Sequence, residues 1–149
     1  MNYIDNAYKE ALKALKIDEV PVGAVIVKDN KIIARAYNKK EINNDPLGHC
    51  EILAIKKACK KLNSWRLVGC DLYVTLEPCL MCLGAIIHAR IDNVYYGVSD
   101  PRFGAIEGSM NLLDDYKFNH HLNYKNLHNE KCGEILKKFF KNKRVKKDI

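Results

Sequence analysis

Two cysteines separated by two residues constrain this chain more than any other feature. They are Cys79 and Cys82, and they directly follow Pro78. A pair at this spacing can close on one metal ion when the second cysteine lies in the first turn of a helix, and the spacing suits zinc. The same spacing is also typical of redox-active dithiols in a reduced compartment. The pair alone therefore predicts either a metal site or a redox site.

A histidine and a glutamate upstream favour the metal site. His49 offers the other side chain that commonly binds zinc, and Glu51 places a carboxylate two residues further on. His49, Cys79 and Cys82 would make three ligands, leave a fourth position free and have Glu51 nearby as a base. Taken singly, His49 is as typical of an ordinary loop, and Glu51 of an exposed first helical turn. Their combination with the cysteine pair favours a metal site.

The order H-x-E followed by P-C-x-x-C resembles the signature of the zinc deaminases that act on nucleobases. Longer segments are similar to bacterial tRNA adenosine deaminases, and this similarity extends over residues 7–144. These segments read E-V-P-V-G-A-V (19–25), D-P (45–46), L-Y-V-T-L-E (72–77), G-A-I-I-H-A-R-I (84–91) and F-N-H (118–120). The resemblance implies a cytidine deaminase-like three-layer α/β/α sandwich with a mixed central sheet, and one Zn²⁺ in each subunit.

The resemblance also implies an activity. The expected reaction is hydrolytic deamination of adenosine to inosine at the wobble position of a tRNA anticodon, with the anticodon stem-loop as partner. Glu51 is expected to be the catalytic residue, taking a proton from water and delivering it to the base and its leaving amine. Members of the family are homodimers, so a homodimer is expected here.

Further residues are assigned to the substrate by the resemblance alone. Asn38 matches an asparagine that hydrogen-bonds the target base, although it is also typical of a turn at the end of a hairpin. A backbone group of Cys50 is expected to face the same base, and Asp100 matches a residue close to the RNA. The C-terminal helix is expected to support anticodon-loop binding through Lys137, Lys138, Phe139, Phe140, Lys143 and Arg144.

Two positions depart from the family pattern. Cys50 stands where alanine is usual, so its thiol could become a fourth ligand and close the zinc site as a structural one. In the loop after Asp100, the pair Gly108-Ser109 is shifted by one position, which weakens the expectation of substrate contacts from that loop.

Two other functions are compatible with the same metal site. A deaminase of a free base or nucleoside, of guanine or cytosine type, would have less need for a basic tail. A non-catalytic RNA-binding module with structural zinc would leave Glu51 without a role. Release of ammonia from free guanine or cytidine, or RNA binding without any ammonia release, would distinguish these two from the tRNA deaminase.

Positive charge is concentrated at the C-terminus. From Lys137 onward there are seven basic residues and one acid, so this segment carries +6 of the net charge of +7. Such a tail is typical of phosphate-backbone binding, but also of a solvated helix end that keeps a protein soluble. Phe139 and Phe140 within the run favour base stacking or anchoring of the helix.

Length and patterning predict one domain over residues 1–149, with a basic helix and tail at about 129–149. Apolar spacing predicts helices over 4–15, 50–62, 80–89 and 129–143, and strands over 22–27, 31–37, 71–76 and 91–98. The order strand, helix, strand after residue 70 implies parallel pairing through a right-handed crossover. The family implies a fifth strand that the pattern does not locate.

Cellular location is predicted from what the sequence lacks. The N-terminus has neither the basic start nor the apolar centre of a signal peptide, and no apolar run approaches membrane-spanning length. A cytoplasmic protein without membrane contact is therefore expected. Cys59, Cys70 and Cys132 are then expected to be reduced, buried side chains.

Overall fold

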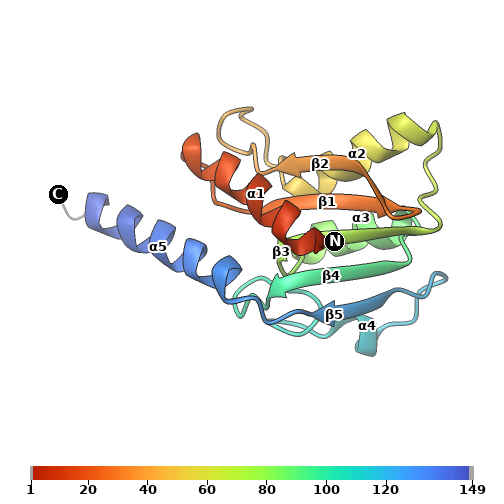
Figure 1. Ribbon diagram of the computed structural model, residues 1–149. Coiled ribbons are helices and arrows are strands. Elements are labelled where there is room, and N and C mark those ends of the chain that lie inside the picture. Colours follow the sequence, from red (N-terminus) through yellow and green to blue (C-terminus); the bar gives the residue numbers. More distant parts are fainter. Residues whose placement is uncertain (1, 148–149) are drawn as a thin grey trace.

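The sheet contains five strands in the order β2-β1-β3-β4-β5, with helices on both faces (Figure 1). The computed structural model describes the backbone of residues 2–147 and the side chains of residues 2–144; the last residues of the predicted basic tail lie outside this range. The mixed sheet and its helical layers confirm the α/β/α sandwich expected from the sequence.

The first two strands form a hairpin. β1 (Gly23–Lys28) and β2 (Lys31–Tyr37) pair antiparallel around a two-residue turn. Asp29 and Asn30 in this turn have φ angles of 51° and 61°. Asparagine and aspartate tolerate such positive values, and the resulting turn matches the twist of the two strands. The predicted hairpin is therefore confirmed.

The central crossover places three strand ends at one edge of the sheet. β3 (Cys70–Leu76) leads through α3 (Leu80–His88) to β4 (Asn93–Val98), and β3 pairs with β4 in parallel. β1 is antiparallel to both β2 and β3, so β2, β3 and β4 all run in the same direction. The segments that follow these strands consequently emerge at the same edge, which is where open α/β sheets bind ligands.

The helices form two layers. α1 (Tyr3–Lys16) and the first part of α5 (Glu130–Lys147) cover one face, whereas α2 (Cys50–Leu62) packs against α3 on the other (Figure 1). Alanines on α1 and α2 are fully buried, which lets both helices pack closely on the strands. The second half of α5 extends past the edge of the sheet (Figure 1).

The sequence pattern missed two short elements. β5 (Asn123–Asn126) pairs in parallel with β4, and α4 (Leu112–Asp115) is a single helical turn. The β5 side chains are mostly exposed, so this edge strand lacks the apolar alternation that reveals a strand. Cys59 also differs from expectation, since it is only partly buried while Cys70 and Cys132 are buried. Among the described residues, no helix is both long and apolar enough to span a membrane.

Candidate metal centre and active site

Three side chains from the starts of α2 and α3 converge at the edge where the parallel strands end. The Nδ1 atom of His49 lies 3.5 Å from the Sγ atom of Cys82 and 3.7 Å from that of Cys79. All three ligand atoms lie within 4.8 Å of one another. His49 precedes α2 and Cys79 precedes α3, so the positive ends of both helices meet at this cluster.

The donor set fits a tetrahedral zinc ion. With Zn–S bonds of about 2.3 Å and Zn–N bonds of about 2.0 to 2.1 Å, a tetrahedral angle separates sulfur from nitrogen by about 3.5 to 3.6 Å. The two observed separations between His49 and the cysteines, 3.5 and 3.7 Å, agree with this value. A site with three protein ligands keeps a fourth position for water or substrate, as in catalytic zinc centres.

The protonation of the two thiols suits cation binding. A hydrogen bond from Cys82 lowers the pKa of Cys79 to about 4, with a smaller contribution from His49, while burial acts in the opposite direction. The same hydrogen bond, together with burial, raises the pKa of Cys82. The hydrogen bond to Cys79 also raises the pKa of His49. One cysteine is therefore a thiolate at neutral pH before a metal arrives, and metal binding would displace the proton from the other.

Glu51 lies beside this cluster in the first turn of α2. Its side chain is only 4% exposed, and burial raises the pKa of the carboxyl group. The Cys50 thiol donates a hydrogen bond to Glu51 Oε1 at 3.1 Å and is not one of the clustered ligand atoms. The Cys50 thiol, which could have been a fourth ligand, is thus hydrogen-bonded to the Glu51 carboxylate. The set of three ligands therefore keeps its fourth coordination position free.

A cleft of about 1270 Å³ connects the cluster to the C-terminal helix. His49, Glu51 and Cys79 line one part of it, and residues along one face of α5 line another. Those α5 residues are Glu130, Gly133, Glu134, Leu136, Lys137, Phe140 and Arg144. Basic side chains therefore occupy the second half of this helical face, while the two glutamates lie in its first turns.

Asn38 and Asp100 both line the cleft, as their positions after β2 and β4 dictate. Asn38 Oδ1 accepts a hydrogen bond from the backbone N–H of Cys50 at 2.8 Å. This hydrogen bond fixes the start of α2. The N–H group of Cys50 could contact a base only if it divided its hydrogen bond between the base and Asn38. The Cys50 side chain is fully buried and does not line the cleft.

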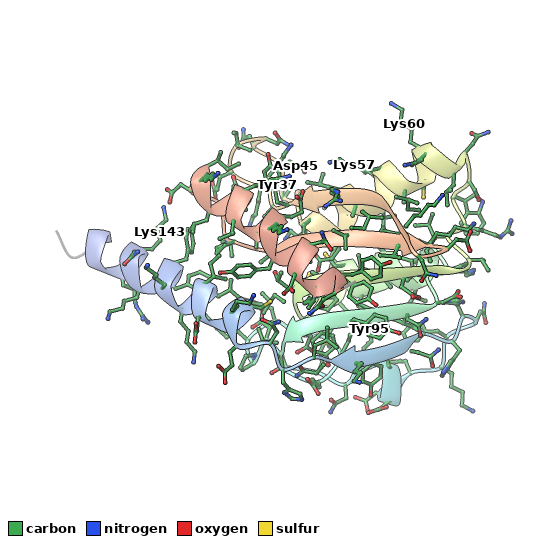
Figure 2. All side chains as sticks on the ribbon, viewed as in Figure 1. Tyr37, Asp45, Lys57, Lys60, Tyr95 and Lys143 are labelled. Carbon is green, nitrogen blue, oxygen red and sulfur yellow. The ribbon has the colours of Figure 1, made fainter. Side chains whose placement is uncertain are left out.

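The six C-terminal residues predicted to support RNA binding divide into two groups: Lys137, Phe140 and Arg144 line the cleft, and Lys138, Phe139 and Lys143 do not. Phe140 is 45% exposed and lines the cleft together with Arg144. Phe139 is 7% exposed, does not line the cleft, and packs edge-on against Phe140. Lys143 lies on the projecting part of α5 and forms an ion pair with Asp18 after α1 (Figure 2). Lys137, Phe140 and Arg144 are thus presented to a ligand in the cleft, whereas Phe139 is buried and Lys143 is paired with Asp18.

Two buried glutamates near the cleft had no role in the sequence analysis. Glu19 accepts hydrogen bonds from the backbone N–H groups of Glu41 and Ile42 at 3.0 and 2.7 Å, in the loop before His49. Glu77 anchors the loop after β4 in the same manner. In the sequence, each of these glutamates adjoins an apolar stretch that must be buried. This position could have indicated that each carboxylate would be buried too and would need hydrogen-bond donors from the backbone.

Sequence comparison identifies the family. The sequence model of the MafB19-like deaminase family matches residues 1–144. The tRNA-specific adenosine deaminase of Bacillus subtilis (strain 168) is 46% identical over 146 residues, which cover 97% of this chain and 91% of that protein. The tRNA-specific adenosine deaminase of Aquifex aeolicus is 43% identical over 139 residues, which cover 93% of this chain and 92% of that protein.

Comparison with solved structures points to the same family as the sequence comparison. A structure solved in a study of A-to-I editing by tRNA:A34 deaminases at the wobble position of transfer RNA matches with a TM-score of 0.86 and 43% identity, over 90% of this chain and 98% of that chain. A guanine deaminase from Bacillus subtilis matches with a TM-score of 0.63 and 43% identity, over 66% of each chain. The chain belongs to the tRNA-specific adenosine deaminase family.

Proposed function

We propose that this protein deaminates adenosine to inosine at the wobble position of a tRNA anticodon. The observation that carries the proposal is the position of Glu51 beside the cluster of His49, Cys79 and Cys82, in a cleft that continues to α5. The high identity to tRNA-specific adenosine deaminases over nearly the whole chain supports the same substrate.

The metal would be one Zn²⁺ in each subunit, held by His49, Cys79 and Cys82. The agreement of the S–N separations with tetrahedral zinc supports this assignment. When bound, zinc would supply a Lewis acid that lowers the pKa of a coordinated water from about 15.7 toward about 7. The positive ends of α2 and α3 would add to the electrostatic stabilisation of the two thiolates.

Glu51 would move the protons. Its carboxylate takes a proton from the attacking water and transfers it to the ring nitrogen next to the carbon under attack. It then carries the proton of the hydroxyl group now on that carbon to the departing amino group, so that a C=O bond forms, the C–N bond breaks and ammonia leaves. Burial raises the pKa of the carboxyl group, which makes Glu51 a better proton acceptor than an exposed glutamate. Asn38, whose Oδ1 is held by Cys50, has an Nδ2 amide that would donate a hydrogen bond to the target base.

The size of the cleft favours RNA over a free base. Sites for small ligands enclose roughly 300 to 1000 Å³, whereas this cleft measures about 1270 Å³ and reaches α5. An enzyme that acts on one base of an RNA must extrude that base and hold its neighbours, and unpaired loop bases are the easiest to extrude. Phe140 and Arg144 would contact the loop around the extruded adenosine.

We also infer a homodimer in the cytoplasm. Leu80, in the first turn of α3 beside the metal cluster, is 54% exposed in the single chain, and a partner subunit at this position would cover it. All six cysteines are free, as in a reducing compartment, and tRNA is present there. Sedimentation of the purified protein would measure the mass, and a monomer at micromolar concentration would contradict the dimer.

A substrate panel tests the function. Zinc-loaded protein is incubated with an anticodon stem-loop carrying a wobble adenosine, and separately with free adenosine, cytidine and guanine, while ammonia and inosine are measured. We expect inosine in the RNA and no ammonia from the free compounds. Ammonia from guanine or cytidine alone would replace the proposal with a free-base deaminase. Stem-loop binding without ammonia release would replace it with a structural-zinc binding module.

A further inference from the structure

The loop after β4 is held in one shape by Glu77. One carboxylate oxygen, Oε1, accepts a hydrogen bond from the N–H of Asp100 at 2.9 Å. The other, Oε2, accepts three from the consecutive N–H groups of Ile106, Glu107 and Gly108 at 2.8 to 3.0 Å. Four donors on one buried carboxylate fix both ends of the loop relative to the metal-binding segment, since Glu77 stands only two residues before Cys79.

Two more sets of contacts fix the middle of the loop. Asp100 Oδ1 accepts hydrogen bonds from the N–H groups of Arg102 and Phe103 at 3.0 and 3.3 Å. Gly104 forms a β-bridge with Cys79, and a Cβ atom at this position would collide with the Glu77 carboxylate. The loop backbone therefore runs directly against the start of α3, which only a glycine at residue 104 allows.

This anchored loop presents an exposed aromatic ring at the cleft. Phe103 is 64% exposed and lines the same cleft as His49 and Glu51. The guanidinium carbon of Arg102 lies 5.6 Å from the centre of the Phe103 ring, and Arg102 also lines the cleft. A large apolar ring beside a cation is the combination that stacks on nucleobases while attracting the phosphate backbone.

We propose that Arg102 and Phe103 form a stacking platform for a nucleobase adjacent to the target adenosine. The proposal rests on the proposed function and adds to it a binding subsite formed by the loop after β4. Because the loop is already ordered, stacking costs little conformational entropy. Stacking accepts any base, so the platform would strengthen RNA binding without selecting the sequence of the neighbour.

The test measures coupling between the ring and a neighbouring base. Affinity and KM are determined for wild type and Phe103→Ala with an anticodon stem-loop, and with stem-loops that are abasic at the nucleotide 5′ or 3′ to the wobble adenosine. We expect Phe103→Ala to weaken binding of the intact stem-loop by roughly 5- to 100-fold, with kcat changed much less. With one of the two abasic stem-loops, the substitution should have no further effect.

Controls separate stacking from folding. Phe103→Trp retains an aromatic face and should bind the intact stem-loop within about twofold of wild type, as expected for a stacking role. Tyr116 is 62% exposed but does not line the cleft, so Tyr116→Ala should leave affinity unchanged. Thermal unfolding of each variant identifies any loss of affinity that comes from misfolding, and Phe103→Leu then reports on the ring in a folded background.

Three results would overturn the platform. One is equal weakening by Phe103→Ala for the intact and both abasic stem-loops. Another is full affinity of Phe103→Leu or Phe103→Ala for the intact stem-loop. The third is a change in molecular mass on sedimentation of Phe103→Ala, which would make the ring part of a contact between two copies of the chain. Failure of the proposed function is separate: it would be the absence of inosine with wild type, and the affinity measurements would still decide the stacking contact.

Discussion

The Nδ1 atom of His49 lies 3.5 Å from the Sγ atom of Cys82, although the two residues are 33 positions apart in the sequence. This contact joins the starts of α2 and α3, which pack against each other on one face of the sheet. It depends on β2 and β3 ending at the same edge, because each strand delivers its following segment to the cluster. The topology of the sheet therefore builds the candidate metal centre.

Replacing individual cysteines should distinguish the zinc ligands from Cys50, the neighbouring cysteine that is not a ligand. Cys82→Ala removes one of the three clustered donors, so we expect less than about one tenth of the wild-type zinc content after dialysis. Cys50→Ala is the matched control, because Cys50 is equally buried but its thiol bonds to Glu51. Metal analysis of both proteins checks this. Loss of zinc from Cys50→Ala instead would show that Cys50 is a ligand.

Zinc affinity should rise with pH. The pKa values of Cys82 and His49 are raised in the metal-free protein, so both groups hold protons that must leave before they can bind zinc. Cys79, with a pKa of about 4, is already a thiolate and adds no pH dependence near neutrality. Competition against a chromophoric chelator between about pH 6 and pH 8 measures the effect. An affinity that stays constant, or falls, over this range would exclude proton displacement.

Two adjacent basic residues of α5 should differ in their effect on RNA binding. Arg144 lines the cleft, whereas Lys143 forms an ion pair with Asp18. We expect Arg144→Ala to weaken stem-loop binding several-fold and to reduce the slope of log affinity against log salt by about 0.7, the value for one phosphate contact on a single strand. Lys143→Ala should change the slope less. Titrations at several salt concentrations compare them, and equal slopes for the two variants would contradict the assignment.

Glu77→Gln should destabilise the protein. The amide group would place a donor among four backbone N–H groups that now share a carboxylate, leaving buried donors without acceptors. The expected loss is about 1 to 3 kcal/mol of unfolding free energy, measured in urea. Glu134→Gln serves as the control, because Glu134 is exposed on α5. If both variants unfold like wild type, Glu77 does not hold the loop.

Much of the fold could be predicted because its signals are local. The spacing of Ile4, Ala7 and Ala11 predicts α1, and the apolar run before Lys28 predicts β1. The strands and helices from β1 to β4 were predicted to within a few residues of their observed bounds. β5 could not be found, since Asn-Tyr-Lys-Asn carries no apolar alternation and becomes a strand only by pairing with β4.

The sequence predicted the metal-binding part of the site better than the part formed by α5. The residue types of His49, Glu51 and Cys79, taken together with their spacing, were enough to predict them, because few side chains bind zinc or transfer protons. By contrast, the six C-terminal residues were predicted together, and only the packing of α5 shows that Phe139 is buried while Phe140 faces the cleft. Arg102 and Phe103 were not predicted as site residues, because their exposure depends on the shape of a loop. Glu77, which is far from this loop in the sequence, fixes that shape through hydrogen bonds.

Locating newly formed inosine in tRNA tests the central claim most directly. A tRNA transcript with a wobble adenosine is treated in ¹⁸O-labelled water with wild type, with Glu51→Gln and with chelator-treated wild type, then digested and analysed by mass spectrometry. We predict inosine at the wobble position only, carrying one ¹⁸O atom, with wild type. Glu51→Gln should retain its zinc and lose at least about 100-fold in rate, and the chelated protein should recover on adding zinc. Inosine from Glu51→Gln at near-normal rate, or deamination at other adenosines in preference to the wobble position, would contradict the account.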